Sequence, residues 1–138
     1  MSDGSRPVPA VQRYILIYAD AGGESHFRDV DVALSEGDFA PPAPPLYTSA
    51  PTTAQQTLFT FAPVGWFGDW HPTPAHQYHV ALSGELEVQV SDGEVRRIRG
   101  GDVVLLKDLT GKGHTTRVIG IEPARAIIVQ IEASGPSI

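Results

Sequence analysis

The sequence contains no cysteine, so it can form no disulfide, no thiolate metal site and no cysteine nucleophile. Basic residues are also few, because 10 Lys and Arg stand against 16 Asp and Glu, for a formal net charge of −6. Such a balance is wrong for binding nucleic acid through a basic face or for docking on an anionic membrane. We therefore expect no nucleic-acid and no membrane partner.

Long apolar runs are absent as well. The longest, Tyr14–Ala19, has the length of a strand, whereas a membrane span needs roughly 18 residues. Residues 1–10 are polar and lack the apolar core of a secretory signal, so we interpret them as a flexible N-terminal tail. Together these absences predict a cytoplasmic protein.

What the chain does contain indicates one small β domain. Its 138 residues are 41% hydrophobic, and 14 Gly and 12 Pro favour many turns over long helices. No segment keeps a helical period for more than about two turns. The remainder of the chain, residues 11–138, is thus predicted to form a single all-β sandwich or barrel. The predicted strands span 11–19, 25–34, 58–61, 77–83, 85–90, 94–99, 103–106, 115–119 and 126–131.

A proline-rich stretch, Phe39–Leu46, interrupts this pattern. Proline cannot join the interior of a sheet because it has no backbone N–H to donate. Two interpretations stand equal at this point: an extended arm that lies over the domain, and a mobile loop.

The most informative strand is predicted at 77–83. Because alternate residues of a strand face opposite sides, Tyr78 and Val80 share an apolar face, and Gln77 and His79 share the other. If that second face is the barrel interior, its amide and imidazole are buried polar groups that need partners. Those partners are water, a ligand or a metal.

Two further histidines fall close to strand ends. His71 lies in an aromatic, proline-rich loop six residues before Gln77, and His114 directly precedes the strand predicted from residue 115. A lone histidine is more often structural than a ligand. Three histidines and a glutamine at the ends of neighbouring strands favour a site, since imidazole binds first-row divalent metals through one ring nitrogen.

At these residues the sequence resembles the cupin superfamily. The first cupin motif, G-x5-H-x-H-x3,4-E-x6-G, is matched in spacing by Gly65, His71, Thr73, Gln77 and Gly84. Thr73 replaces the second histidine of the motif, and Gln77 replaces its glutamate.

The second cupin motif, G-x5-P-x-G-x2-H-x3-N, is matched less well. Gly101 opens it, and Gly111 and His114 fit if two residues are inserted, while Leu109 and Val118 replace the usual Pro and Asn. The resemblance covers residues 65–118. It implies a small cupin-like β-barrel, the double-stranded β-helix or jelly-roll sandwich, with a cavity open at one end and commonly a homodimer.

A cupin metal site usually offers three imidazoles and a carboxylate. Here the resemblance carries over His71 and His114, with Gln77 as a neutral oxygen donor, and His79 lies on the same strand face as Gln77. Such a nitrogen-rich set suits Zn, Fe, Ni, Mn or Cu better than Mg or Ca. A bound divalent transition metal and a metal-free pocket stand at about even odds.

The residues around the motifs suggest a pocket wall. Trp66, Phe67 and Trp70 crowd into one loop, and an aromatic mouth is modestly favoured over core packing; Thr73 is included as a pocket residue. Either Asp108 or Thr110 is expected to hold the turn before His114 through a hydrogen bond between its side chain and the backbone, and the alternative for Asp108 is a general base.

Three residue sets outside the pocket receive structural roles. His26 is expected to be exposed, and His76 to be a surface or loop-packing residue. The arginines of the strand at 94–99 are expected to form a solvated face with acidic partners on the neighbouring strand.

The favoured function is a cupin-type enzyme that acts on a small, largely apolar organic molecule. The chemistry expected is non-redox isomerisation, cyclisation, dehydration or lyase work, similar to polyketide cyclases of this superfamily, with His79 or His114 as acid–base groups. The alternatives are a metal-dependent dioxygenase, against which the missing carboxylate counts, and a non-catalytic module that binds a small molecule.

Overall fold

The computed structural model describes residues 10–132, which fall into two compact units: 10–13 with 31–51, and 14–30 with 52–132. Every regular element in this part of the chain is a strand, so the all-β prediction is confirmed. Residues 1–9 of the predicted tail lie outside the described residues. The strands are β1 (Val11–Ala19), β2 (Ser25–Ala33), β3 (Ser35–Gly37), β4 (Leu46–Thr48), β5 (Ala54–Ala62), β6 (Phe67–His71), β7 (Gln77–Ser83), β8 (Glu85–Val90), β9 (Val95–Arg99), β10 (Val103–Leu106), β11 (His114–Ile119) and β12 (Ala124–Ile131).

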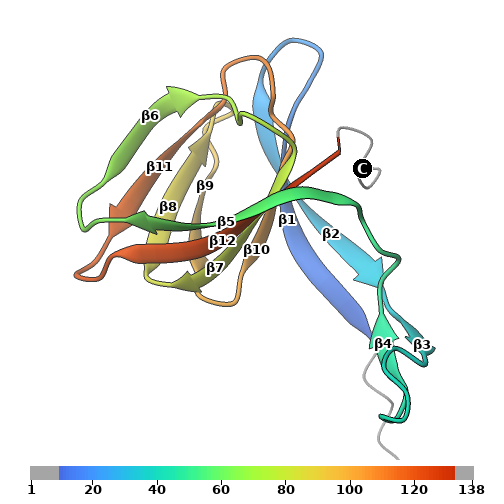
Figure 1. The fold of residues 1–138 in the computed structure, drawn as a ribbon. Coiled ribbons are helices and arrows are strands. Elements are labelled where there is room, and N and C mark those ends of the chain that lie inside the picture. Colours follow the sequence, from blue (N-terminus) through green and yellow to red (C-terminus); the bar gives the residue numbers. More distant parts are fainter. Residues whose placement is uncertain (1–9, 133–138) are drawn as a thin grey trace, which may run out of the picture. The chain divides into compact units, whose positions relative to one another are not determined.

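The larger unit is a sandwich of two sheets (Figure 1). One sheet has six strands in the order β2-β1-β10-β7-β12-β5, and the other has four in the order β6-β11-β8-β9. β1 runs parallel to β10, whereas β7 runs antiparallel to both its neighbours. Because strands far apart in sequence are adjacent in each sheet, this is the double-sheet jelly-roll architecture that the sequence predicts.

The core between the sheets is seen most clearly in β8, whose residues alternate strictly between buried and half-exposed. In β8, Leu86, Val88 and Val90 are buried while the residues between them are half-exposed. They pack with Ile17 from the six-stranded sheet and Ile98 from β9 in one apolar cluster. Full burial of each such side chain contributes about 1.5–3 kcal/mol, so this shared face holds the two sheets together.

The two turns that flank β8, at Ser83–Gly84 and at Ser91–Gly93, are marked by glycine in the sequence and behave differently. The Ser91–Gly93 turn makes a hairpin of β8 and β9, with Asp92 Oδ1 accepting the Glu94 N–H at 2.8 Å. At Gly84, by contrast, the chain passes from one sheet to the other, since β7 and β8 belong to different sheets. The sequence marks both as turns, but it does not say which of them pairs its flanking strands.

The smaller unit contains the proline-rich stretch. β3 and β4 form a short antiparallel hairpin with Ser35 opposite Thr48, and residues 38–45, which hold most of the stretch, form its connection. Within this unit Arg13 binds Asp31 through Nε at 2.8 Å, and the Leu34 N–H donates to the carbonyl of Ala10 at 2.8 Å. The stretch therefore connects two short strands, an arrangement that neither sequence interpretation included.

One strand of the site, β6, was not predicted. Its sequence, Phe67–His71, mixes aromatic residues with Gly and Asp and shows no apolar alternation. It becomes a strand because β11 pairs with it, with His114 opposite His71 and Arg117 opposite Phe67. Tertiary pairing rather than local propensity creates this edge strand.

The described residues contain no helix of the length and apolar character that crossing a bilayer requires.

We predict that Gly113→Ala destabilises the fold more than Gly120→Ala does. Both glycines have positive φ, +73° and +83°, so either alanine adds a backbone penalty of about 1–2 kcal/mol. At Gly113 the new Cβ would also overlap the carbonyl oxygen of His71, whereas at Gly120 it would meet open space. We expect an extra loss of about 1–3 kcal/mol in urea unfolding for Gly113→Ala, and equal losses for the two variants would contradict this close packing.

Candidate functional site

A cavity of about 410 Å³ lies within the larger unit, between its two sheets. Most of its wall is apolar and comes from β1, β5, β8, β10 and β12. Its polar lining residues are Thr60, His71, Gln77, His79, His114, Thr116 and Gln130. A mainly apolar cavity with a few convergent polar groups is the usual form of a small-molecule site.

The structure brings the four predicted site residues to this one cavity, from both sheets. His71 ends β6 and His114 begins β11, and the pairing of these strands sets the two residues opposite each other with ring centroids 4.7 Å apart. Gln77 and His79 come from β7 of the facing sheet, on the strand face that parity assigns to them.

His114 is held by a buried carboxylate. Its Nδ1 lies 2.6 Å from Oδ2 of Asp108, which is 0% exposed, and His114 itself is 5% exposed. Because a carboxylate only accepts hydrogen bonds, Nδ1 carries the proton and Nε2 is left with its lone pair. The other oxygen of Asp108, Oδ1, makes no hydrogen bond within the described residues. The predicted turn-holding role of this side chain is therefore wrong, since its contact is with the imidazole.

His71 is oriented in the same way by the backbone. Its Nδ1 lies 2.5 Å from the carbonyl oxygen of Asp69, which can only accept, so Nδ1 is again the protonated nitrogen. The site thus has two imidazoles whose Nε2 atoms are hydrogen-bond acceptors when the rings are neutral. Fixing the second nitrogen of each ring also fixes its orientation.

His79 differs because no carboxylate of the described residues forms an ion pair with it. Burial, and secondarily the charge that His114 carries when protonated, lower the pKa of His79 from 6.5 to about 4. At neutral pH this imidazole is uncharged. It can polarise a bound group through a hydrogen bond but is a weak base.

Gln77 belongs to a row of three amides that sequence reasoning did not recognise. Gln130 Nε2 donates to Gln77 Oε1 at 3.0 Å, and Gln56 Nε2 donates in turn to Gln130 Oε1. The three residues lie in register across β7, β12 and β5. A signal was present, because Gln130 is a polar residue within the apolar strand predicted at 126–131, but its partner strands could not be known.

The predicted pocket residues do not all reach the cavity. Trp66 lines it, while Phe67 and Trp70 are about half-exposed and are not among the described residues of its wall. Thr73 is buried, and its hydroxyl donates to the Ala75 carbonyl at 2.9 Å, which is a loop-stabilising contact. Phe61, from the edge strand β5, is a lining residue that was not predicted.

The expectation that His26 is simply exposed is wrong. Its two ring nitrogens contact carboxylates, with Nε2 2.7 Å from Asp20 and Nδ1 2.8 Å from Asp92. The hydrogen bond to Asp20, followed by that to Asp92, raises the pKa of His26. It ties two turns together outside the cavity. His76 is half-buried and is likewise absent from the described cavity wall.

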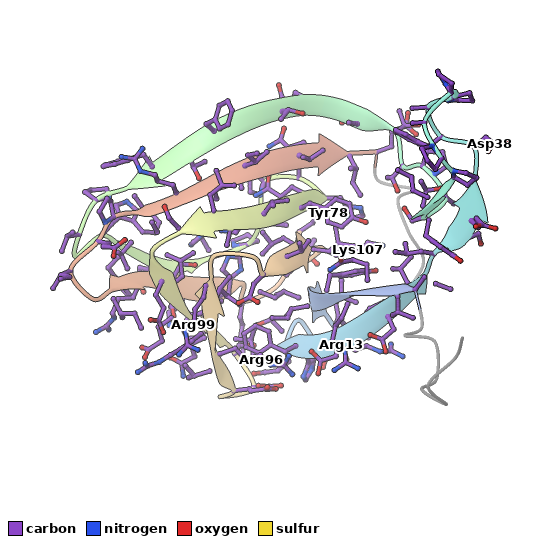
Figure 2. The ribbon with its side chains drawn as sticks, turned by 90° about the horizontal axis from the view of Figure 1, so that it is seen from below. Arg13, Asp38, Tyr78, Arg96, Arg99 and Lys107 are labelled. Carbon is purple, nitrogen blue, oxygen red and sulfur yellow. The ribbon has the colours of Figure 1, made fainter. Side chains whose placement is uncertain are left out.

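The arginines of β9 form ion pairs on the edge strand of the four-stranded sheet (Figure 2). Arg97 and Arg99 both contact Glu85 on the neighbouring strand, at 3.5 and 3.2 Å. Arg96 contacts Asp29 at 2.7 Å and lies over the ring of Phe27. The predicted solvated face is present, and it is separate from the cavity.

Metal binding does not fit this arrangement well. His71 and His114 present two oriented Nε2 donors, but the described residues contain no group of three His, Cys, Asp or Glu side chains placed to hold a metal ion. One of the two lone pairs of the Gln77 oxygen, the expected oxygen donor, accepts a hydrogen bond from Gln130. We therefore derive no chemical step through a metal.

No protein-family description and no curated protein matches the sequence. Among solved structures, the chain is similar to the cupin domain of Schizosaccharomyces pombe Cnp3, with 16% identity, a TM-score of 0.47, and 78% of this chain and 73% of that one covered. It is also similar to protein NMB1881 from Neisseria meningitidis, with 16% identity, a TM-score of 0.40, and coverage of 58% and 78%. A third neighbour, from Salmonella typhimurium, is described as an ethanolamine utilization protein q, with 20% identity, a TM-score of 0.37, and coverage of 90% and 98%.

These likenesses concern the fold alone. The chain itself has a double-sheet jelly-roll fold: its two facing β-sheets enclose the cavity, and the two segments that resemble cupin motifs supply His71, Gln77 and His114 to its wall.

Because the pKa of His79 is lowered in the folded protein, we predict that this residue makes the fold less stable in acid and that His79→Gln lessens this loss. The unfolded chain takes up a proton at this residue below pH 6.5, whereas the folded protein does so only near pH 4. Stability therefore falls as the pH drops through this window, by up to about 3 kcal/mol from this group. Between pH 6.5 and 4.5, His79→Gln should lose less stability than wild type in urea unfolding, and parallel losses would contradict the prediction.

Proposed function

We propose that this protein binds a small, largely apolar organic molecule in the cavity between its sheets and catalyses a non-redox proton transfer on it. The observation that carries the proposal is the convergence of three oriented or uncharged imidazoles, His71, His79 and His114, on a mainly apolar cavity. Isomerisation, cyclisation, dehydration and lyase reactions all require such a transfer next to a carbonyl or hydroxyl group.

His114 is the proposed base. Its Nε2 takes a proton from the bound molecule, and the positive charge that develops on the ring is stabilised by the Asp108 carboxylate 2.6 Å from Nδ1. This is the way a buried carboxylate supports a catalytic imidazole in hydrolases, here without a nucleophile. The same proton is returned to another atom of the molecule, or to a departing hydroxyl as water.

His79 is the proposed electrophilic group. With its pKa lowered to about 4 it stays neutral, so its ring N–H can donate to a carbonyl oxygen of the bound molecule without releasing a proton. For a ketone, loss of the α-proton to His114 moves an electron pair onto that oxygen. The two groups then act on opposite ends of one enolate, from facing sheets.

The composition of the cavity wall favours this reaction over oxygen activation. The iron centre of many dioxygenases needs two histidines and one carboxylate, and none of the described residues that line this cavity carries a carboxylate. Its apolar wall and volume of about 410 Å³ suit a compact, uncharged ring compound.

Exchange of α-protons on a bicyclic ketone tests the proposal directly. Incubated with 2-tetralone in D₂O, the protein should accelerate deuterium incorporation above the buffer rate, as followed by NMR. Asp108→Asn should reduce this rate about 10- to 100-fold while keeping a hydrogen-bond acceptor for Nδ1, and His114→Gln should abolish it. His26→Gln removes a histidine outside the cavity and should leave the rate unchanged.

The same assay separates the alternatives. A rate that survives EDTA supports the imidazole mechanism, whereas a rate that EDTA abolishes and one metal ion per chain restores would replace it with metal-assisted chemistry. Saturable binding of 2-tetralone without exchange would contradict catalysis of this kind and leave a binding module.

A further inference from the structure

The three amides that cross the six-stranded sheet form a hydrogen-bond row with a defined direction. Gln56 donates to Gln130, and Gln130 donates to Gln77 at 3.0 Å, each from Nε2 to the next Oε1. The row starts at Gln56, which is exposed on the edge strand β5, and ends at Gln77 in the cavity wall. Each amide has one oxygen and one NH₂ group, so each fixes the orientation of the next.

The direction of the row decides what Gln77 can offer. Its oxygen is turned toward Gln130, from which it accepts, so the NH₂ group on the other side of the amide is the donor that its side chain offers to a ligand. No hydrogen bond of this NH₂ group occurs within the described residues, and the group is not sealed from the cavity. Donation along the row also polarises the terminal amide and strengthens its N–H groups as donors.

The facing sheet has the opposite character. The Nε2 atoms of His71 and His114 are acceptors in the neutral rings, because Asp69 and Asp108 hold both Nδ1 protons. One wall of the cavity therefore donates hydrogen bonds and the other accepts them.

We infer that the Gln56–Gln130–Gln77 row is a ligand-orienting subsite. It selects an uncharged molecule whose carbonyl oxygen accepts from Gln77 as well as from His79, and whose acidic C–H or O–H lies at the His71–His114 wall. Enolisable ketones and hydroxyketones have this pairing of groups. Carboxylates do not, since their charge would face the two imidazole acceptors. This inference rests on the proposed function, for which it names the substrate class and its orientation.

Three probes of one shape test the subsite by binding alone. Tetralin has no polar group, 2-tetralone has only an acceptor, and 2-tetralol adds a hydroxyl donor. In NMR titrations of the whole protein, 2-tetralone should shift the side-chain NH₂ signals of Gln77, assigned by their loss in Gln77→Met, and tetralin should not. Gln77→Met should weaken the binding of 2-tetralone about 3- to 10-fold and leave the affinity for tetralin within twofold of the wild-type value.

A substitution at the far end of the row provides the sharper test. In Gln56→Glu the introduced carboxylate can only accept, so Gln130 must turn its NH₂ group toward it and its oxygen toward Gln77. Gln77 then turns as well and presents its oxygen to the cavity. The affinity ratio of 2-tetralone to 2-tetralol should fall about 3- to 10-fold, although residue 56 is outside the described cavity wall. Gln12→Glu, which makes the same charge change at another exposed residue, should leave the ratio unchanged.

These outcomes are independent of turnover. A protein that binds 2-tetralone through Gln77 but exchanges no protons would refute the proposed catalysis and support the subsite. Two results would overturn the subsite even if the protein exchanges α-protons. One is an equal loss of affinity for 2-tetralone and tetralin in Gln77→Met, and the other is an unchanged 2-tetralone to 2-tetralol affinity ratio in Gln56→Glu. Failure of all three probes to bind at millimolar concentration would overturn the proposed ligand class and this inference with it.

Discussion

The carboxylate of Asp108 is fully buried, and its contact with His114 is the interaction on which the site depends. Removing a charge from water is costly unless a partner compensates, and the imidazole N–H is the partner that the structure provides. The contact fixes the tautomer of His114, and the tautomer makes Nε2 an acceptor toward the cavity. The pair also joins Asp108, which precedes the glycine-rich turn, to the first residue of β11.

The close approach of backbone segments around this pair matters as much as the pair itself. Gly113 lies directly against the carbonyl of His71, where no side chain could fit, next to the strand pairing that places the two rings 4.7 Å apart. His71 is oriented by the carbonyl of Asp69, so its position depends on the edge strand β6. Close packing against His71 thus explains why the turn before β11, which the cupin resemblance includes, has glycine at residue 113.

The cavity combines hydrogen-bonding groups that come from different sheets. Gln77 and His79 come from one sheet, and His71 and His114 come from the other. An NH₂ donor at the end of the amide row faces two acceptor nitrogens across an apolar space. In such an environment, hydrogen bonds are stronger than in water, and an unmatched polar group is more costly. Recognition is therefore expected to depend on which end of a small molecule is the acceptor.

The sequence alone determined the all-β class and most strand positions, because strand periodicity and turn residues are local properties. It also singled out His71, Gln77, His79 and His114, which all line the cavity. It could not place β6, the Asp108–His114 contact or the amide row. Those features depend on which strands become neighbours: β6 exists through pairing with β11, and Gln56 meets Gln130 only because β5 lies beside β12. Side-chain partners across a sheet are separated by up to 74 residues in the chain, and only tertiary packing brings them together.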